Sequence, residues 1–381
     1  MNHAAPEVLA SSAVVPALVN AHAHLDLTSA GCVPFGGDFD EWLAGVRSHR
    51  VGMDAQRVDA SVQQGVTALR TGGVAAVGDI AGHLAPGSSL ARLRTAGLGG
   101  VSFTELFGMA GDRERTAVQE IARLCAEAGE QDAATVRRGV QPHAPYSAGA
   151  EVFRAALRSG LPVSTHLAES PEETEFLRDG TGRFRALLKR TGAWDDRIRF
   201  GARHPVDWLA DLLQHTHGAR VLCAHCNCID DEALARLATL PISVAYCPRA
   251  SAYFGRTSHR YREMLDLGIA VALGTDSMMS LDTPDRLSTL DDARLLMRRD
   301  GLSIETALAM ATVHGARALG LPVDAFTLTP SDAPKAGILQ VPLAIADESS
   351  AGVIRAFGDG HSAPVWLADG KIFAELLPQA G

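Results

Sequence analysis

Apolar and polar positions along this chain occur in blocks that predict a regular succession of strands and helices. Short apolar runs rich in valine, isoleucine and alanine predict eight strands, at residues 14–22, 74–80, 97–105, 137–143, 161–166, 220–225, 241–247 and 269–276. Segments with helical spacing predict helices at residues 58–73, 112–130, 150–160, 230–240 and 258–268. A last helix is predicted over 303–321, with Ser303 as its N-cap.

Near-continuous apolar strands that alternate with helices are typical of a parallel sheet covered on both faces. Eight such repeats fit a closed barrel better than an open sheet, so we predict a (β/α)8 TIM barrel over residues 14–321. Beyond residue 322, short apolar runs are separated by Gly, Asp and Pro turns. They predict a small flanking β-sandwich, a reduced appendage made of residues 1–13 and 322–381.

Composition and charge narrow the range of partners. The 381 residues carry a formal net charge of −9 and no extended Lys/Arg cluster, which argues against nucleic acid and anionic membranes. No apolar run is long enough to predict a membrane helix, and the apolar N-terminus lacks the basic stretch of a signal peptide. The six cysteines are scattered, so we expect free thiols in a cytoplasmic protein.

Histidines and an aspartate stand at the ends of the predicted strands. His22 and His24 end the first strand, His166 the fifth, His225 the sixth and Asp276 the eighth. Each residue alone would be an ordinary core or surface group. Because active sites of TIM barrels lie at the carboxyl ends of the strands, we expect these side chains to meet at one mouth.

Three imidazoles and a carboxylate are a suitable ligand set for one divalent metal ion, Zn²⁺ or Fe²⁺. We assign His22, His24, His166 and Asp276 as the ligands. A metal in such a site eases removal of a proton from bound water. Glu169, close after His166, is placed to shuttle a proton between that water and a substrate.

His225 is a further catalytic candidate, because it could orient the water or polarise the group under attack. Asp276 is expected to help take the proton of the water. A competing metal cluster of Cys223, His225 and Cys226 is disfavoured, because Cys226 would face the opposite side of the strand. The chain contains neither the glycine-rich dinucleotide motif nor the P-loop motif.

Six segments, PALVNAHAHL, HAPYS, HLAES, AHCNCID, YCPRASAYFG and LGTDSMMS, together resemble the amidohydrolase superfamily. They are most similar to its branch of metal-dependent deaminases and chlorohydrolases, which act on amino-substituted heteroaromatic rings. The resemblance spans about residues 14–321. It implies a TIM barrel, one catalytic Zn²⁺ or Fe²⁺, a flanking β-sandwich, and the ligand and catalytic roles assigned above.

Within this branch, CPRASAYFG resembles the 6-amino-6-deoxyfutalosine deaminases of the futalosine route to menaquinone. The resemblance implies hydrolytic deamination of an adenine ring, giving futalosine and ammonia. Arg249 is expected to hold the carboxylate of that substrate, or alternatively to pair with a loop acid. Tyr253 and Phe254 would line the ring pocket or pack against the following helix.

Three further residues are candidate substrate contacts. Glu105 and His143 would bind polar groups of the sugar or ring, or support the structure, and Ser277 adjoins the aspartate ligand. Alternative substrates are adenosine or S-adenosylhomocysteine, guanine, or a halogenated triazine. A non-catalytic scaffold is the alternative of another class, and it would be expected to lack metal ligands. By resemblance, a homodimer with a small-molecule substrate as its ligand is also expected.

Overall fold

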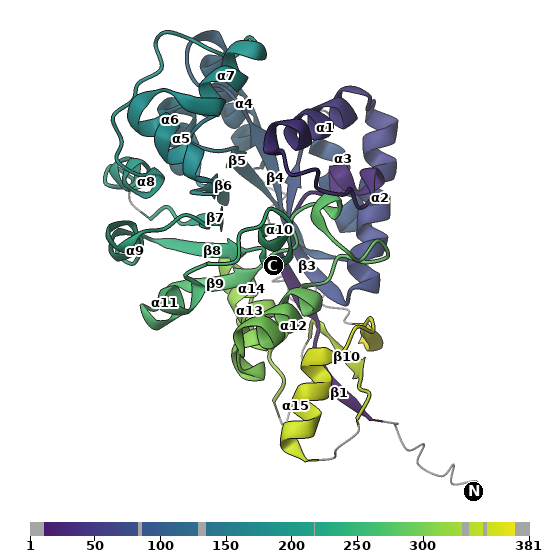
Figure 1. Ribbon diagram of the computed structural model, residues 1–381. Helices are drawn as coiled ribbons and strands as arrows, with labels where there is room; N and C mark the ends of the chain where they lie inside the picture. The colour runs from purple at the N-terminus through teal and green to yellow at the C-terminus, as the bar shows by residue number, and fades with distance from the viewer. Residues whose placement is uncertain are drawn as a thin grey trace, which may run out of the picture.

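The computed structural model describes residues 11–82, 86–128, 135–216, 218–329, 335–345 and 349–369, so the predictions for residues 1–10 and 370–381 lie outside it. Eight parallel strands, paired in chain order, form one sheet surrounded by helices (Figure 1). The strands are β2 (Leu18–Ala23), β3 (Val74–Ala81), β4 (Gly99–Leu106), β5 (Val136–Pro142), β6 (Val163–Leu167), β7 (Val221–His225), β8 (Ile242–Tyr246) and β9 (Ala270–Leu273). They confirm the predicted barrel strands.

The sheet closes where the chain after β9 meets β2. The backbone N–H groups of Thr275 and Asp276 both donate to the carbonyl oxygen of His22, each at 3.0 Å. Asn20 supports this closure, because its Nδ2 donates to Oγ1 of Thr275 at 2.7 Å and its Oδ1 accepts from the Thr275 N–H at 3.1 Å. The predicted (β/α)8 architecture is thereby confirmed.

Helices connect the strands and cover the barrel. They are α1 (Phe39–Val51), α2 (Ala55–Thr71), α3 (Pro86–Thr95), α4 (Gly111–Ala128), α5 (Ala150–Arg158), α6 (Pro171–Asp179), α7 (Gly182–Arg190), α8 (Pro205–Leu213), α9 (Asp231–Leu237), α10 (Pro248–Tyr253), α11 (Tyr261–Asp266), α12 (Thr289–Asp300), α13 (Ile304–Ala311) and α14 (Val313–Ala318). Short 3₁₀ helices are η1 (Leu25–Ala30), η3 (Met278–Ser280) and η4 (Val323–Phe326). Buried aliphatic side chains of the strands and inner helix faces form the main core.

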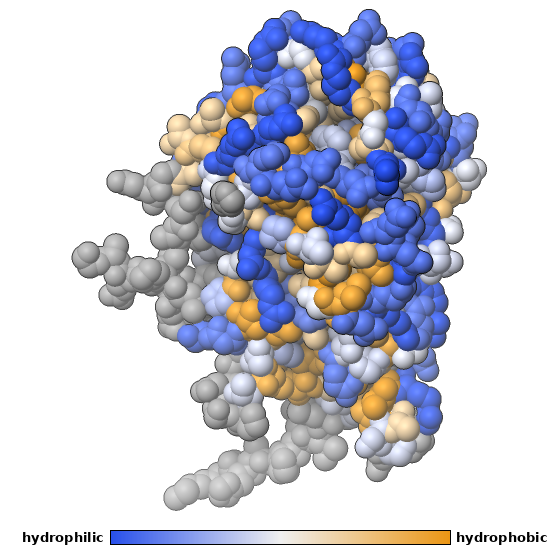
Figure 2. Space-filling model, turned by 90° about the vertical axis from the view of Figure 1, so that its left-hand side faces the viewer, coloured by the Kyte–Doolittle hydropathy of each residue, from blue (hydrophilic) through white to orange (hydrophobic). Residues whose placement is uncertain are grey.

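The outer face near α8, α9 and α11 carries mainly hydrophilic side chains, with hydrophobic ones interspersed in patches (Figure 2). Within the described residues, no helix combines the length and the apolar character needed to cross a bilayer.

A small antiparallel sheet lies beside the barrel. It consists of β1 (Ser12–Pro16), β10 (Gly337–Pro342) and β11 (Val365–Asp369), in the order β1-β10-β11. The helix α15 (Ser350–Asp359) attaches to α12 through the buried Arg294, whose Nε donates to the Phe357 carbonyl at 3.1 Å. The proposed domain limits at residues 14 and 321 stay a prediction.

Three predicted elements differ from those observed. The predicted strand 14–22 is two strands, because Pro16 ends β1 and the chain then turns from the small sheet into the barrel. The predicted helix 303–321 is interrupted at Thr312, which has φ −132° and ψ −90°. Part of the expected strand region after residue 350 is the helix α15, capped by Ser349.

Candidate metal centre

The two histidines of the HAH stretch lie at the carboxyl end of β2. His22 is fully buried and His24 is 7% exposed. Both ring nitrogens of His22 and Nδ1 of His24 are buried and have no hydrogen-bond partner among the described residues. Because buried polar atoms normally have partners, orphaned nitrogens on neighbouring histidines indicate that these rings bind a ligand.

Strand β6 places His166 beside this pair. Its ring centroid lies 5.1 Å from that of His22 and 5.5 Å from that of His24. Nδ1 of His166 lies 2.9 Å from the carbonyl oxygen of His143, so we assign the ring proton to Nδ1. This assignment leaves the lone pair of Nε2 available for a metal ion.

Asp276 reaches the same point from the end of β9. Its Oδ1 lies 3.5 Å from Nε2 of His24 and 3.8 Å from Nε2 of His22. The backbone of Asp276 has φ 60°, in the left-handed region that aspartate and asparagine tolerate better than most residues. The aspartate is therefore held in an uncommon conformation at the point where the barrel closes.

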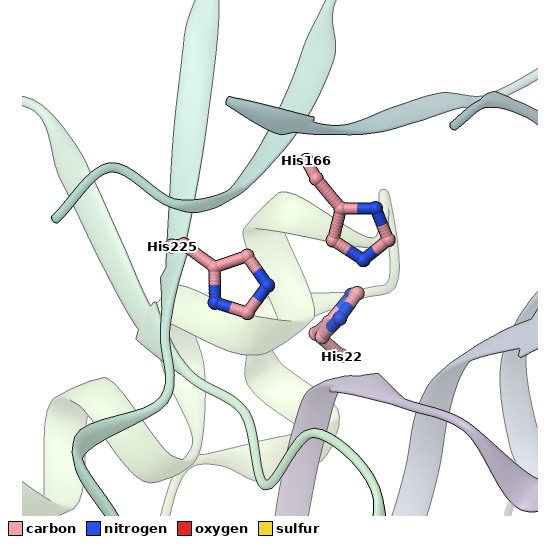
Figure 3. Close-up of side chains that lie close together, drawn as sticks. All are labelled: His22, His166 and His225. Atoms are coloured by element: carbon pink, nitrogen blue, oxygen red, sulfur yellow. The ribbon is translucent and has the colours of Figure 1, made fainter. Parts of the chain in front are cut away.

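His225 ends β7 and completes the cluster. Figure 3 shows its ring beside those of His22 and His166, and the centroid distances are 5.4 and 5.2 Å. The backbone of His225 has φ 73°, and Nε2 of His259 lies 2.8 Å from its carbonyl oxygen. Such a strained residue with dedicated support is typical of functional positions. No sequence pattern indicates this supporting role of His259.

Two overlapping groups of side chains could hold a metal ion. One is His22, His166 and His225, the other is His22, His24 and Asp276, and within each group the ligand atoms lie within 4.8 Å of one another. Each of the four predicted ligands thus belongs to one of two groups that share His22. Imidazole and carboxylate donors in these numbers fit a divalent ion such as Zn²⁺ or Fe²⁺.

Burial sets the charges of this cluster in the metal-free protein. It lowers the pKa of His22 and His24 well below the usual value, with neighbouring histidines adding to the effect. Burial also lowers the pKa of His166 to about 4. The pKa of Asp276 is raised to about 7, first by burial and then by the nearby charge of Glu169. The imidazoles are therefore neutral at pH 7, the form that binds metals.

Glu169 lies in the loop between β6 and α6, and Glu173 holds the backbone of this loop. The buried carboxyl group of Glu173 accepts hydrogen bonds from the N–H groups of Ala168 at 3.1 Å and Glu169 at 3.0 Å. Burial raises the pKa of Glu173 to about 8. Sequence reasoning missed Glu173, although an acidic residue in the first turn of a helix next to HLAE was a usable signal.

The candidate contacts Glu105 and His143 lie together at the ends of β4 and β5. His143 Nε2 is 3.8 Å from Glu105 Oε1, a buried oxygen with no hydrogen-bond partner among the described residues. Arg50 of α1 donates to Glu105 Oε2 at 2.9 Å and to Asp26 Oδ2 at 3.0 Å. Arg50 was not predicted, because only the tertiary packing of α1 over the mouth brings it there.

Arg249 has other partners than the expected substrate carboxylate. Its Nε and Nη2 donate to Oδ2 of the fully buried Asp292, at 3.1 and 3.0 Å. Its Nη1 donates to Oγ1 of Thr283 at 2.8 Å, and its Nη2 also donates to the carbonyl of Ser288 at 3.2 Å. Arg249 is therefore paired with Asp292 of α12, and the carboxylate-binding role expected from the sequence stays a prediction.

Tyr253 and Phe254 pack against the segment that precedes and begins α1. The Tyr253 hydroxyl donates to the carbonyl of Val33 at 2.8 Å, and the ring of Phe254 lies 4.9 Å from that of Trp42. These contacts agree with a packing role over the mouth. Ser277, the remaining candidate, is buried, and its Oγ has no hydrogen-bond partner among the described residues.

The competing cysteine cluster does not form. All six cysteines are free thiols, and burial raises the pKa of the Cys223 thiol, which disfavours the thiolate that a metal requires. Within the described part of the chain, the groups able to hold a metal contain no cysteine.

Comparison with known proteins gives the family. Residues 13–330 match the Amidohydrolase family. The chain belongs to the amidohydrolase family. As a member, it is a hydrolytic enzyme, and the scaffold alternative is set aside because the predicted ligands are all present and close together.

Two relatives of this amidohydrolase match most of its length. The 5-methylthioadenosine/S-adenosylhomocysteine deaminase of Pyrococcus furiosus is 26% identical over 82% of this chain and 71% of its own. The aminodeoxyfutalosine deaminase of Deinococcus radiodurans is 27% identical over 84% of this chain and 76% of its own.

The fold also matches a solved structure, the aminofutalosine deaminase of Helicobacter pylori in complex with methylthio-coformycin. The TM-score is 0.73, the sequence identity is 21%, and the match covers 95% of this chain and 86% of the other. At this identity the likeness supports the shared fold.

Proposed function

We propose that this amidohydrolase is a metal-dependent deaminase that removes the amino group from a purine-like ring by hydrolysis. The best candidate reaction converts 6-amino-6-deoxyfutalosine and water into futalosine and ammonia, as in the futalosine route to menaquinone. The observation that carries the proposal is a cluster near Glu169, in which His22, His24 and Asp276 form one group of possible ligands and the His166 ring lies 5.1 Å from that of His22. The names of the two relatives agree, because both denote deaminases of adenine-type nucleosides.

The site would hold one divalent ion through His22, His24, His166 and Asp276. When bound, this ion lowers the pKa of water toward neutrality and so supplies the nucleophile. The chain supplies the rest of the chemistry. The carboxyl group of Asp276, buried beside His24, accepts a proton from the water.

Glu169 moves the other protons. As an acid it protonates the ring nitrogen next to the amine-bearing carbon, which makes that carbon more electrophilic. The carbon then gains the oxygen of the water as a hydroxyl group. The proton taken by Asp276 passes to the amine, which leaves as ammonia, and the hydroxyl proton returns to Glu169 as the carbonyl of the product forms. His225, whose backbone is fixed by His259, lies where it can donate to the developing charge.

Polar groups of the substrate have partners at the ends of β4 and β5. Glu105 offers the unpartnered, buried Oε1 as an acceptor, and His143 lies 3.8 Å from it. Burial lowers the pKa of His143 to about 3, with the charge of Arg50 adding to the effect. A neutral imidazole and an unpartnered carboxyl oxygen together suit the hydroxyl groups of a ribose-like ring.

A second candidate keeps the reaction and changes the substrate to a nucleoside without a carboxylate, such as 5-methylthioadenosine or adenosine. One observation favours it: Arg249 is occupied by Asp292, so the residue expected to select a carboxylate-bearing substrate is already paired. Guanine and halogenated triazines stay as further alternatives.

A panel of substrates tests the proposal. The purified protein would be incubated with aminodeoxyfutalosine, adenosine, 5-methylthioadenosine, S-adenosylhomocysteine and guanine, and ammonia release and the ultraviolet change from adenine to hypoxanthine would be recorded. We expect the highest kcat/KM for aminodeoxyfutalosine. Ammonia release from none of them by the metal-loaded protein would overturn the proposed function.

A further inference from the structure

Arg256 lies at the mouth of the barrel, just after α10, and no role follows for it from the sequence. Its guanidinium carbon lies 5.5 Å from the ring centroid of Phe254 and 5.7 Å from that of Phe39. The side chain is 22% exposed, and its Nη1 is buried without a hydrogen-bond partner among the described residues. Two aromatic faces therefore hold a cation in place while one of its donors stays available.

The carboxylate closest to that donor is Glu169. Its Oε1 lies 3.8 Å from Arg256 Nη1, an ion-pair distance that is too long for a hydrogen bond. The Glu169 side chain is 14% exposed, so the pair is largely shielded from water. Charges attract more strongly where water is excluded.

The rest of Glu169 is already fixed by other residues. Its N–H donates to Glu173 at 3.0 Å, and its carbonyl accepts a hydrogen bond from Nδ2 of Asn227 at 3.2 Å. For the side chain, in contrast, the single ion-pair partner within the described residues is Arg256. The backbone contacts fix the main chain of Glu169, and the arginine attracts its carboxylate.

We propose that Arg256 is a positioning residue, which holds the carboxylate of Glu169 in place for proton transfer at the metal centre. The inference rests on the proposed role of Glu169 as proton shuttle. It also assigns no substrate carboxylate to Arg256. Glu169 transfers protons to the reacting ring, so an arginine paired with its carboxylate lies close to that ring. Arg256 is therefore too far from the opposite end of the substrate to bind a carboxylate there.

Arg183 provides a matched control. Its guanidinium carbon lies 5.6 Å from the same Phe39 ring, but its Nη2 pairs with Glu172 at 3.3 Å instead of Glu169. Replacing Arg183 by methionine removes a cation from the same aromatic ring without touching the carboxylate of the shuttle. Effects common to both variants are therefore packing effects, and effects confined to Arg256→Met report on Glu169.

The first test uses the metal-free protein and needs no activity. Thermal midpoints would be measured for Arg256→Met, Glu169→Gln and the double variant, and for Arg183→Met with and without Glu169→Gln. We expect the downward shift caused by Arg256→Met to be clearly smaller in the Glu169→Gln background, whereas the Arg183→Met shift is the same in both. Additive shifts for the Arg256 pair would overturn the proposal.

The second test uses the metal-loaded enzyme and its best substrate. We expect Arg256→Met to lower kcat by roughly tenfold or more with KM and metal content nearly unchanged, and Arg256→Lys to restore part of the loss. The loss should disappear in the Glu169→Gln background. A raised KM with unchanged kcat would instead make Arg256 a substrate-binding residue and contradict the inference. If the wild-type protein deaminates none of the tested compounds, the proposed function fails, while the thermal cycle still decides whether Arg256 and Glu169 are coupled.

Discussion

The backbone N–H of Asp276 donates to the carbonyl oxygen of His22 at 3.0 Å, so the bond that closes the barrel also joins two of the predicted metal ligands. The side chains of the same two residues approach to 3.8 Å. The candidate metal centre therefore lies on the seam between the first and last strands of the barrel. A rigid seam is a suitable place for ligands whose positions must be set by the fold.

Replacing Asp276 by asparagine should weaken metal binding without unfolding the protein. Asparagine tolerates the φ of 60° at this position and keeps the backbone N–H, so the seam is preserved. The ion loses its one anionic ligand, and we expect its affinity to fall by about 100-fold or more. Competition with a chromogenic chelator measures the affinity. An Asp276→Asn protein that holds metal as tightly as the wild type would exclude Asp276 as a ligand.

Metal affinity should rise with pH up to about pH 7 and level off above it. In the metal-free protein the pKa of Asp276 is about 7, whereas that of His166 is about 4 and those of His22 and His24 are well below 6.5. Between pH 5 and 7 the ion thus displaces one proton, from Asp276, and affinity should increase about tenfold per pH unit before levelling off above pH 7. Chelator competition across this range gives the slope. A slope of two or more, centred near the ordinary histidine pKa, would contradict the assigned charges.

Replacing Glu169 by glutamine should separate metal binding from catalysis. The amide cannot transfer the proton, so we expect kcat to fall by roughly 10²–10⁴-fold while the metal content stays that of the wild type. Steady-state kinetics with metal analysis on the same sample measures both quantities. Near-wild-type turnover of the glutamine variant would remove Glu169 from the mechanism.

Replacing Arg249 by methionine should destabilise the protein and leave substrate preference unchanged. The change leaves the buried carboxyl of Asp292 without its partner, and breaking a buried pair in this way costs about 3–5 kcal/mol. The double variant with Asp292→Leu should recover much of this stability. Urea unfolding provides the free energies, and the KM ratio of aminodeoxyfutalosine to adenosine provides the specificity. A selective rise in KM for aminodeoxyfutalosine would restore the original carboxylate-binding role.

The barrel and the gathering of His22, His24, His166 and Asp276 could be predicted because both depend on strand order alone. Parallel strands of a barrel bring their carboxyl ends to one face, so any residue at those ends converges there. The strand periodicity located the ends to within a few residues. It did not reveal the break after Pro16, because the apolar run continues through the point where the chain leaves the small sheet for the barrel.

The supporting residues could not be predicted, because their positions depend on packing between distant segments. Arg249 stands next to a barrel strand, but its direction is decided by Asp292, which is 43 residues away on α12. Arg50 reaches Glu105 only because α1 lies over the mouth, 55 residues away in the sequence. Local patterns indicate where a helix or a strand lies. They carry no information about which residues of distant segments will pair.

The most direct test of the central claim is anomalous X-ray diffraction from crystals of the metal-loaded protein, recorded at the zinc and iron absorption edges. We predict one strong anomalous peak per chain, within coordination distance of His22, His24, His166 and Asp276. A metal-saturated protein that showed no peak among these four side chains, or a peak bound elsewhere in the chain, would contradict the assignment of the metal centre.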